Sequence, residues 1–200
     1  MAKRAFDYSA ALAALIMLAP ALITVAALIW LHDGRAPLYG HQRVGRYGRT
    51  FRCLKFRSMI PDGGAVLQAY LEANPAAKEE WERTQKLEND PRVTPIGKFI
   101  RRTSIDELPQ IWNVLIGEMS IVGPRPITRP ELDRYGKERR YYLLVRPGIT
   151  GLWQVSGRSE TTYQARIKYD RDYLEQWSFV RDVWIIAKTV PAVLAARGAH

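Results

Sequence analysis

The chain has 200 residues, a length that fits one domain of ordinary size. Its single cysteine, Cys53, excludes an internal disulfide, and we interpret that residue as a small hydrophobe rather than a nucleophile. Lysine and arginine number 30 against 20 acidic residues, so the formal net charge is +10. That charge suits nucleic acid, an anionic membrane surface or a phosphorylated substrate as the partner.

Residues 10–31 form an apolar run that contains no charged residue. A straight helix over this run would be roughly 33 Å long at about 1.5 Å per residue, enough to cross a hydrocarbon core of about 30 Å. A secretory signal has a shorter apolar core of about 7–15 residues. The run therefore predicts a membrane helix, and a helix that spans the bilayer is one of two alternatives.

The second alternative is a re-entrant helix that bends inside the membrane and returns to the face it entered. Pro20 lies near the middle of the run, where it removes a backbone hydrogen bond. Proline kinks also occur in spanning helices, so the flanking charges decide more. Basic residues flank both ends of the run: Lys3, Arg4, Arg35, Arg43, Arg46, Arg49 and Arg52. Because positive residues prefer the cytoplasmic side, both ends are predicted there, with Pro20 at the membrane bend.

After the apolar run, residues 50–56 alternate well enough to predict a short strand or hairpin. Residues 66–87 are rich in Ala, Glu, Lys and Leu and predict a helix that is interrupted near Asn74-Pro75. We expect this helical insert, at about residues 65–90, to be solvated and to carry no chemistry.

The second half of the chain alternates short helices with turns rich in proline and glycine. The predicted helices cover residues 96–102, 106–116, 131–144, 163–177 and 178–196. Gly117 is placed to end the second of them. The last is amphipathic, so it either lies on the membrane interface or packs on the protein's own core.

Two adjacent carboxylates, Asp106 and Glu107, follow the basic helix and are the main candidates for chemistry. In the structural alternative, Ser104 begins a capping box S-x-x-E, which would explain both acids without catalysis. Pro109 favours another helix start, because with Asp106 as the N-cap the proline falls where no backbone N–H is needed. The acids would then lie at the positive end of a helix.

That position predicts the chemistry of Asp106. A helix N-terminus and nearby cations lower a carboxylate's pKa, so Asp106 is expected to be ionised at neutral pH. An ionised carboxylate is able to ligate Mg²⁺ or to attack phosphorus. From the pattern alone, surface capping is the commoner explanation of an Asp-Glu pair.

Other candidate residues are interpreted structurally. Asp170-Arg171-Asp172 resembles a D-x-D metal motif, but we interpret its acids as one polar patch on a helix. His32 and His41 lack companions that would ligate a metal. Trp112 and Trp153 are expected in the core or at an interface, not as platforms that stack bases.

Five stretches carry a resemblance to a known family: KRAFDYSAAL, LKFRSM, IGKFIRRTSIDELPQIWNVLIGEMSIVGPRP, VRPGITGLWQVSGR and YDRDYLEQWS. In this order they resemble the monotopic phosphoglycosyl transferases, the bacterial sugar transferases that start glycan assembly on a polyprenol carrier. They cover the chain almost end to end, apart from the helical insert. The implied fold is an α-dominated α+β single domain with a re-entrant membrane helix, interfacial amphipathic helices and a short β-hairpin.

The resemblance implies transfer of a sugar 1-phosphate from a UDP-sugar to undecaprenyl phosphate, with release of UMP. It implies a covalent intermediate on Asp106 and a Mg²⁺ ion held by Glu107 and Asp106, without fixing which acid holds the metal at each stage. The implied phosphate-binding residues are Lys55, Arg101 and Arg158, and the implied nucleotide-binding residues are Pro124, Arg125 and Pro126.

The family's re-entrant helix bends at Ser-Pro, which is Ala19-Pro20 here, so the proline is kept and the serine hydroxyl is missing. Residues 1–34 are expected to form that helix, and residues 35–200 a catalytic domain at the cytoplasmic face of the bacterial inner membrane. The expected partners are the donor, the acceptor and membrane lipid, without nucleic acid, in the initiation of exopolysaccharide, capsule, O-antigen or protein glycan synthesis. The competing hypothesis is a basic, membrane-tethered protein that binds anionic lipid or nucleic acid without catalysis.

Overall fold

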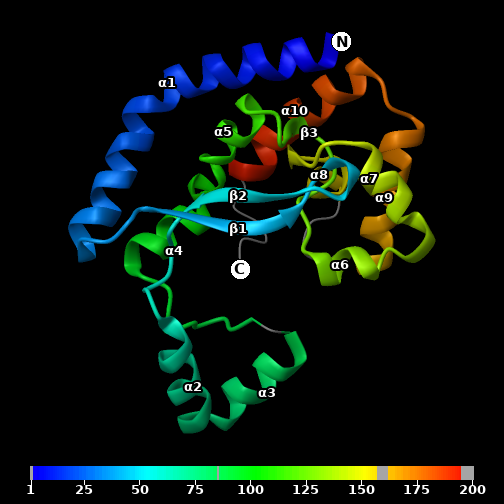
Figure 1. Ribbon diagram of the computed structural model, residues 1–200. Coiled ribbons are helices and arrows are strands. Elements are labelled where there is room, and N and C mark those ends of the chain that lie inside the picture. The colour runs from blue at the N-terminus through cyan, green and yellow to red at the C-terminus, as the bar shows by residue number, and fades with distance from the viewer. Residues whose placement is uncertain (1, 85, 157–161, 195–200) are drawn as a thin grey trace.

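The structure is a computed structural model that describes residues 2–84, 86–156 and 162–194. Helices dominate it, and two small sheets lie among them, which confirms the predicted α-dominated fold (Figure 1). The main elements are α1 (Ala2–Asp33), β1 (Leu38–Val44), β2 (Thr50–Phe56), α2 (Gly63–Ala73), α3 (Pro75–Thr84), α4 (Pro95–Arg102), α5 (Gln110–Leu115), β3 (Ser120–Val122), α6 (Arg129–Asp133), α7 (Arg139–Leu144), β4 (Gly148–Thr150), α8 (Leu152–Ser156), α9 (Tyr163–Glu175) and α10 (Phe179–Leu194).

The apolar run belongs to α1, one long helix that contains Pro20. By length and composition α1 is able to cross a membrane, and the rest of the protein leaves nearly all of its apolar stretch uncovered. Figure 1 shows the helix as two arms that meet at a bend. Pro20 has no N–H to donate, and the Thr24 hydroxyl donates to the Pro20 carbonyl at 2.8 Å, a contact that also bends helices.

Both ends of α1 are tied to the same globular body. At the N-terminal end, Lys3 Nζ lies 2.5 Å from Oδ2 of the buried Asp182, and Asp7 accepts a hydrogen bond from the Ser120 hydroxyl at 2.8 Å. Near the other end, Asp33 forms an ion pair with Arg57 at 2.5 Å. The helix therefore leaves the body and returns to it.

The predicted hairpin is confirmed, since β1 pairs antiparallel with β2 from Leu38↔Phe56 to Val44↔Thr50. Between the strands, the 3₁₀ turn η1 (Arg46–Gly48) places Tyr47 at a φ of 61°. The Asn113 side chain of α5 holds β2, because its Oδ1 accepts from the Leu54 N–H at 3.0 Å. Cys53 lies buried in the hydrophobic cluster that joins α1, β2 and α5, as predicted for a small hydrophobe.

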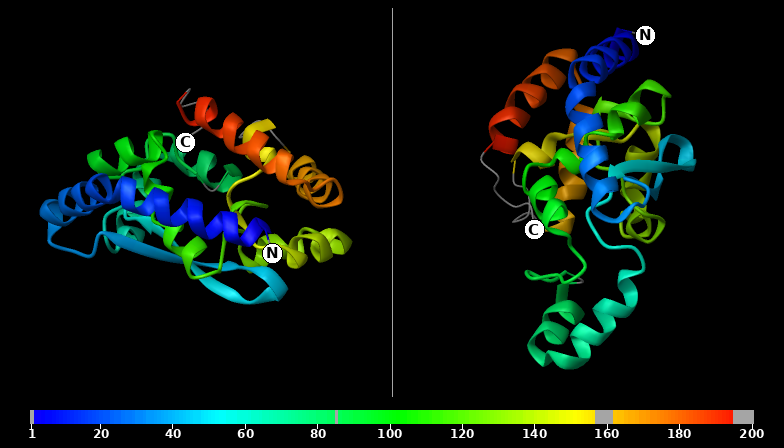
Figure 2. Two further views of the ribbon diagram at one scale, coloured as in Figure 1. Left: turned by 90° about the horizontal axis from the view of Figure 1, so that it is seen from above. Right: turned by 90° about the vertical axis from the view of Figure 1, so that its left-hand side faces the viewer.

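The helical insert consists of α2 and α3, which project from one end of the body (Figures 1 and 2). The two helices are separated at Asn74, which is extended, with φ −133° and ψ 90°. A proline disfavours helical backbone at the residue before it, so Pro75 explains the break. The predicted interruption is confirmed.

The predicted basic helix is confirmed as α4. Its N-cap Thr94 accepts a hydrogen bond from the Gly97 N–H at 2.9 Å, and Pro95 occupies the first turn. Gly97 lies directly against the backbone of Ser58, so any Cβ at position 97 would overlap Ser58. This contact fixes α4 against the segment that follows β2.

The helix predicted over residues 106–116 is wrong at its start. Residues Ile105–Glu107 form a 3₁₀ turn, η2, and α5 begins only at Gln110. Ser104 has a φ of 57° and its side chain makes no capping bond, so the alternative capping box does not form either. Pro109 explains the late start, because its ring suits the edge of a helix and lacks the N–H that an interior position uses.

The helix predicted over residues 131–144 is broken into α6, the 3₁₀ turn η3 (Gly136–Glu138) and α7. Gly136 lies at the break with a φ of 50°, which glycine adopts readily. The parallel pair of β3 and β4 was not predicted, because each strand has three residues and lies among turn-forming residues.

The helices α9 and α10 begin within one residue of their predicted starts. In α10, Asp182 and Ile185 are fully buried, whereas Val180 and Trp184 are exposed. The helix therefore packs on the core through one side. Contact of its other side with the membrane interface stays a prediction.

Asp182 joins three helices, since its carboxylate also accepts hydrogen bonds from Tyr173 Oη at 2.7 Å and Trp177 Nε1 at 3.2 Å. We predict that Asp182→Ala lowers the free energy of unfolding by about 3–5 kcal/mol, because it removes the counter-charge of Lys3 and leaves only the Val122 carbonyl as its partner. The control Glu175→Ala removes a 3.9 Å surface contact with Arg171 and should cost less than about 1 kcal/mol. Thermal unfolding in detergent compares the two, and equal losses would contradict the prediction.

Candidate active site

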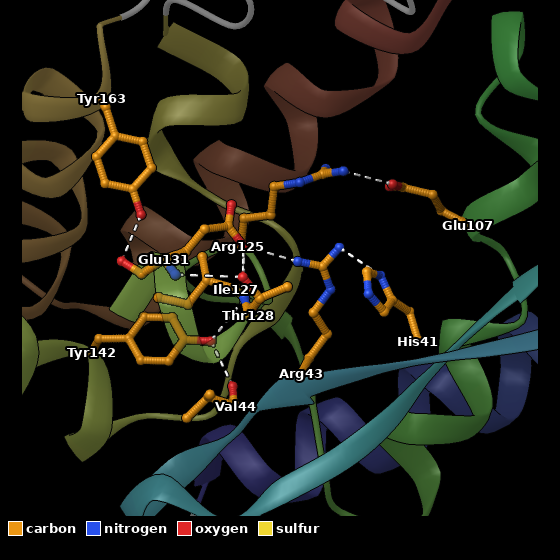
Figure 3. Close-up of polar contacts among 10 residues, drawn as sticks. All are labelled: His41, Arg43, Val44, Glu107, Arg125, Ile127, Thr128, Glu131, Tyr142 and Tyr163. Carbon is orange, nitrogen blue, oxygen red and sulfur yellow. Dashed lines mark hydrogen bonds and ion pairs between the residues drawn. The ribbon is translucent and has the colours of Figure 1, made fainter. Parts of the chain in front are cut away.

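Asp106 and Glu107 lie on η2, between α4 and α5, and β2 brings Lys55 to them. Lys55 Nζ lies 2.7 Å from Glu107 Oε1 and 3.5 Å from Asp106 Oδ2. Arg125 reaches the same Glu107 oxygen at 3.1 Å (Figure 3). The structure therefore brings both predicted carboxylates together with two of the predicted cations.

The ionised form of Glu107 is stabilised more than that of Asp106. Burial alone would raise its pKa, but Arg125 and Lys55 outweigh burial and lower the pKa of Glu107 to about 2. Glu107 therefore carries its negative charge throughout the physiological pH range.

Asp106 is in the opposite situation. It is 9 % exposed, and burial raises the pKa of this carboxyl above its ordinary value although Lys55 and Arg101 act to lower it. The predicted lowering of the Asp106 pKa is therefore wrong. Two causes explain the difference: α5 starts too late to place Asp106 at a helix N-terminus, and the side chain is packed away from water.

Arg101 approaches Asp106 from the last turn of α4. Its Nε donates a hydrogen bond to Ser58 Oγ at 2.8 Å, which fixes the direction of the side chain. Burial lowers the pKa of Arg101, while the charges of Asp106 and Asp90 act to raise it. The third predicted phosphate-binding residue, Arg158, lies outside the described residues.

The Pro124-Arg125-Pro126 turn is rigid on both sides of its arginine. Both prolines are buried, and the Pro124 carbonyl accepts from the Gly148 N–H at 2.7 Å. Directly after the turn, the Ile127 N–H donates to Tyr142 Oη at 3.3 Å (Figure 3). This fixed backbone directs the Arg125 guanidinium at Glu107.

His41 and Arg43 were not predicted as neighbours of this site. Arg43 Nη1 pairs with Glu131 Oε2 at 3.0 Å, and its Nη2 lies 3.0 Å from His41 Nδ1 (Figure 3). Burial, Arg43 and Lys55 lower the pKa of His41, so its ring is neutral at neutral pH. Side chains alternate between the two faces of a strand, and this pattern in β1 could have predicted both neighbours. The pairing of β1 with β2 places His41 and Arg43 on the face that carries Lys55.

Asp106 and Glu107 fit Mg²⁺, which proteins hold through one or two carboxylates while phosphates and waters complete the shell. Lys55 and Arg125 both contact Oε1 of Glu107, which leaves Oε2 for a cation. No group of three or more His, Cys, Asp or Glu side chains gathers within residues 2–84, 86–156 and 162–194, so a site built from protein ligands alone is not indicated there.

The acids at positions 170 and 172 do not form the single polar patch that was predicted. Asp170 is buried and accepts a hydrogen bond from Tyr135 Oη at 2.8 Å, while Asp172 lies at the surface of α9. Burial raises the pKa of Asp170 to about 7. Trp153 is buried as expected, and Trp112 is 51 % exposed.

Comparison with known proteins assigns this chain to a family of enzymes. The model of the family described as bacterial sugar transferase matches residues 1–196, and the chain belongs to that family. The exopolysaccharide production protein ExoY of Sinorhizobium fredii is 48% identical over 200 residues, which cover 100% of this chain and 88% of the relative.

Two longer relatives match over nearly the whole chain. The UDP-galactose-lipid carrier transferase of Erwinia amylovora is 50% identical over 198 residues, and the undecaprenyl-phosphate galactose phosphotransferase of Salmonella typhimurium is 48% identical over 201 residues. Each alignment covers 99% of this chain and 41% of the relative, so this chain corresponds to less than half of either protein.

Asp170 predicts a pH dependence of stability. Its pKa is about 7 in the folded state and about 3.8 in the unfolded state, so the folded protein binds more protons between these values and loses stability as the pH rises through them. The full loss is on the order of 4 kcal/mol at most. Asp170→Asn cannot ionise, so the variant should gain stability relative to the native protein from pH 4 to pH 8. Melting temperatures in detergent measure this, and a difference that is constant with pH would contradict it.

Proposed function

We propose that this chain transfers a sugar 1-phosphate from a UDP-sugar to undecaprenyl phosphate, giving undecaprenyl-diphosphate-sugar and UMP. The observation that carries the proposal is the pair of adjacent carboxylates that Lys55 and Arg125 contact, with Arg101 in the helix before them. Both substrates are anionic phosphates, which such cations bind and neutralise. The family and the names of its relatives support this reaction class.

In the first step, Asp106 is the nucleophile. One of its carboxylate oxygens attacks the phosphorus that carries the sugar, the bond from that phosphorus to the UMP oxygen breaks, and UMP leaves with the electron pair. The phosphosugar is then held on Asp106 as an acyl phosphate. Burial makes Asp106 more basic than Glu107, and a more basic carboxylate is the better nucleophile of the two.

In the second step, a phosphate oxygen of undecaprenyl phosphate attacks the same phosphorus. The bond to Asp106 breaks and its carboxylate is restored. Lys55 and Arg101 hold phosphate oxygens during both steps, and Arg125 holds the nucleotide part of the donor. Mg²⁺, when bound by Glu107 and Asp106, would add neutralisation of the phosphate charge.

Galactose is the first sugar to test. The Erwinia and Salmonella relatives, at 50% and 48% identity, are named for galactose. A Xanthomonas campestris relative that is named for glucose is 39% identical, and an Aeromonas hydrophila relative that is named for N-acetylgalactosamine is 36% identical. We therefore propose UDP-galactose as the donor, in the initiation of exopolysaccharide synthesis.

We further propose that α1 is re-entrant and that the body lies at the cytoplasmic face of the inner membrane. The support is that Lys3 and Asp33 are tied to one body, at Asp182 and Arg57. A straight spanning helix would have to separate its two ends by the thickness of the bilayer. A re-entrant helix keeps the site at the lipid surface, where the acceptor's phosphate is reached while its chain stays in lipid.

The alternative function, binding of anionic lipid or nucleic acid without catalysis, has less support. Two buried or half-buried acids at the centre of the basic site would repel an anionic ligand that undergoes no reaction. The family description also names a transferase.

The reaction predicts UMP release when purified protein, Mg²⁺ and undecaprenyl phosphate are mixed with UDP-galactose, and less release with UDP-glucose or UDP-N-acetylgalactosamine. Asp106→Asn should lower turnover at least about 10³-fold, because it removes the nucleophile. When undecaprenyl phosphate is left out, a donor labelled in its sugar should label the native protein and should not label the Asp106→Asn variant. Asp172→Asn, at the surface of α9, is the matched control and should keep its activity.

Three outcomes would contradict parts of this proposal. No UMP from any of the UDP-sugars would overturn the reaction. A near-normal rate in Asp106→Asn would overturn the nucleophile. UMP release from UDP-glucose that exceeds release from UDP-galactose would overturn the donor.

Re-entry predicts that cysteines at exposed positions 2 and 36 face the same side of the membrane. Neither Ala2→Cys nor Ala36→Cys should react with an impermeant maleimide in intact spheroplasts, and both should react after permeabilisation. The native protein is the control, because its only cysteine, Cys53, is buried. Labelling of one position from outside would show that α1 spans the membrane.

A further inference from the structure

Three arginines from distant parts of the chain come together near the N-terminal end of α1. Arg4 lies on α1, Arg46 on the turn of the hairpin, and Arg146 directly after α7. The views in Figures 1 and 2 place the start of α1, the turn of the hairpin and α7 on the same side of the body. Each of the three side chains is half-buried.

Shared neighbours hold the three side chains together. Arg146 Nε donates to the Gly117 carbonyl at 2.7 Å, and the Arg4 guanidinium lies against the Cα of the same glycine. Arg46 Nε donates to the Leu144 carbonyl at 2.9 Å, two residues before Arg146. Gly117 has a φ of 90°, which favours glycine at this turn.

None of these arginines is paired with a carboxylate in the described part of the chain. Their hydrogen bonds go to backbone carbonyls and, for Arg4, also to the Tyr8 hydroxyl. The acid beside them, Asp7, is engaged by the Ser120 hydroxyl and the Ile121 N–H. Burial, together with the charges of Arg4 and Arg46, lowers the pKa of Arg146. Half-buried cations without a counter-charge favour an anion beside them.

The residues around the three arginines are of the kinds that border a binding site for a lipid headgroup. Arg4 lies 3.8 Å from the centre of the Tyr8 ring, and Arg46 lies 4.4 Å from that of Tyr47. Tyr47 is 64% exposed and Leu144 is 56% exposed, so aromatic and aliphatic surface borders the charges. Tyrosines are typical of the membrane interface, and the apolar part of α1 begins within two turns of Arg4.

We propose that Arg4, Arg46 and Arg146 form a binding site for the phosphate of an anionic membrane phospholipid. The site is separate from the candidate catalytic acids, because Lys55 beside those acids lies five residues beyond Thr50, the first residue of β2 after the turn. Five residues of strand span about 17 Å at 3.3 Å per residue. It needs only that α1 enters the membrane, and it does not depend on the proposed transfer reaction. The bound lipid would join α1, the hairpin and α7 at the membrane surface.

Native mass spectrometry of delipidated protein in detergent tests the site. The native protein should retain one phosphatidylglycerol tightly and no phosphatidylcholine of the same acyl chains. Arg46→Gln with Arg146→Gln should weaken phosphatidylglycerol retention at least about tenfold. Arg4 is left unchanged, because it also holds α1 to the Val114 and Met119 carbonyls.

The control variant removes two cations elsewhere on the protein, by Lys98→Gln with Arg102→Gln. Both are exposed and flank the exposed Phe99. The control variant should change retention less than about twofold. Melting temperatures show whether each double variant is folded. If a variant does not fold, the proposal is decided by comparing retention of phosphatidylglycerol and phosphatidylcholine by the native protein.

Four results would overturn the proposal. They are equal retention of the two lipids by the native protein, unchanged retention in the Arg46 and Arg146 variant, an equal loss in the control, and displacement of phosphatidylglycerol by millimolar inorganic phosphate. The third would indicate unspecific attraction between charges. The last would indicate a site for free phosphate.

Discussion

Lys3 ties the N-terminal end of α1 to the body through an ion pair with Asp182, a carboxylate with no exposed surface. Much of the architecture depends on this contact. The same carboxylate accepts hydrogen bonds from Tyr173 of α9 and from Trp177, so one buried charge joins α1 to α9 and α10. At the other end, Asp33 meets Arg57 just after β2. An apolar helix fixed in this way cannot move independently of the body that carries the candidate site.

In the candidate site, two adjacent acids share contact with one lysine but differ in the direction of their pKa shifts. Lys55 contacts both, but Glu107 also receives Arg125 and lies low in pKa, whereas burial dominates at Asp106. The division suits a reaction in which one carboxylate must stay charged and the other must form and release a bond. It arises from tertiary packing, since both residues belong to the same 3₁₀ turn.

Hydrophobic periodicity and proline were enough to predict α1, the hairpin, the split between α2 and α3, and the starts of α9 and α10. They failed in two places. Pro109 was placed in the first turn of a helix that starts at Asp106, whereas α5 starts only after this proline. The β3–β4 pair depends on two segments that are 25 or more residues apart. The adjacent acids were predicted from their pattern and the cations from the family resemblance. The raised pKa of Asp106 required knowledge of its burial, and Arg43 required the register of the hairpin.

Gly97 has no side chain, and its position sets the spacing of the site's cations. Its Cα rests on the Ser58 backbone, Ser58 follows Lys55 by three residues, and Arg101 follows Gly97 by four. The distance between the Cα atoms of Lys55 and Arg101 is therefore set by the main chain, through van der Waals contact between two backbone segments. Thermal motion of the side chains leaves this distance unchanged, so the proposed phosphate-binding cations would keep a constant spacing.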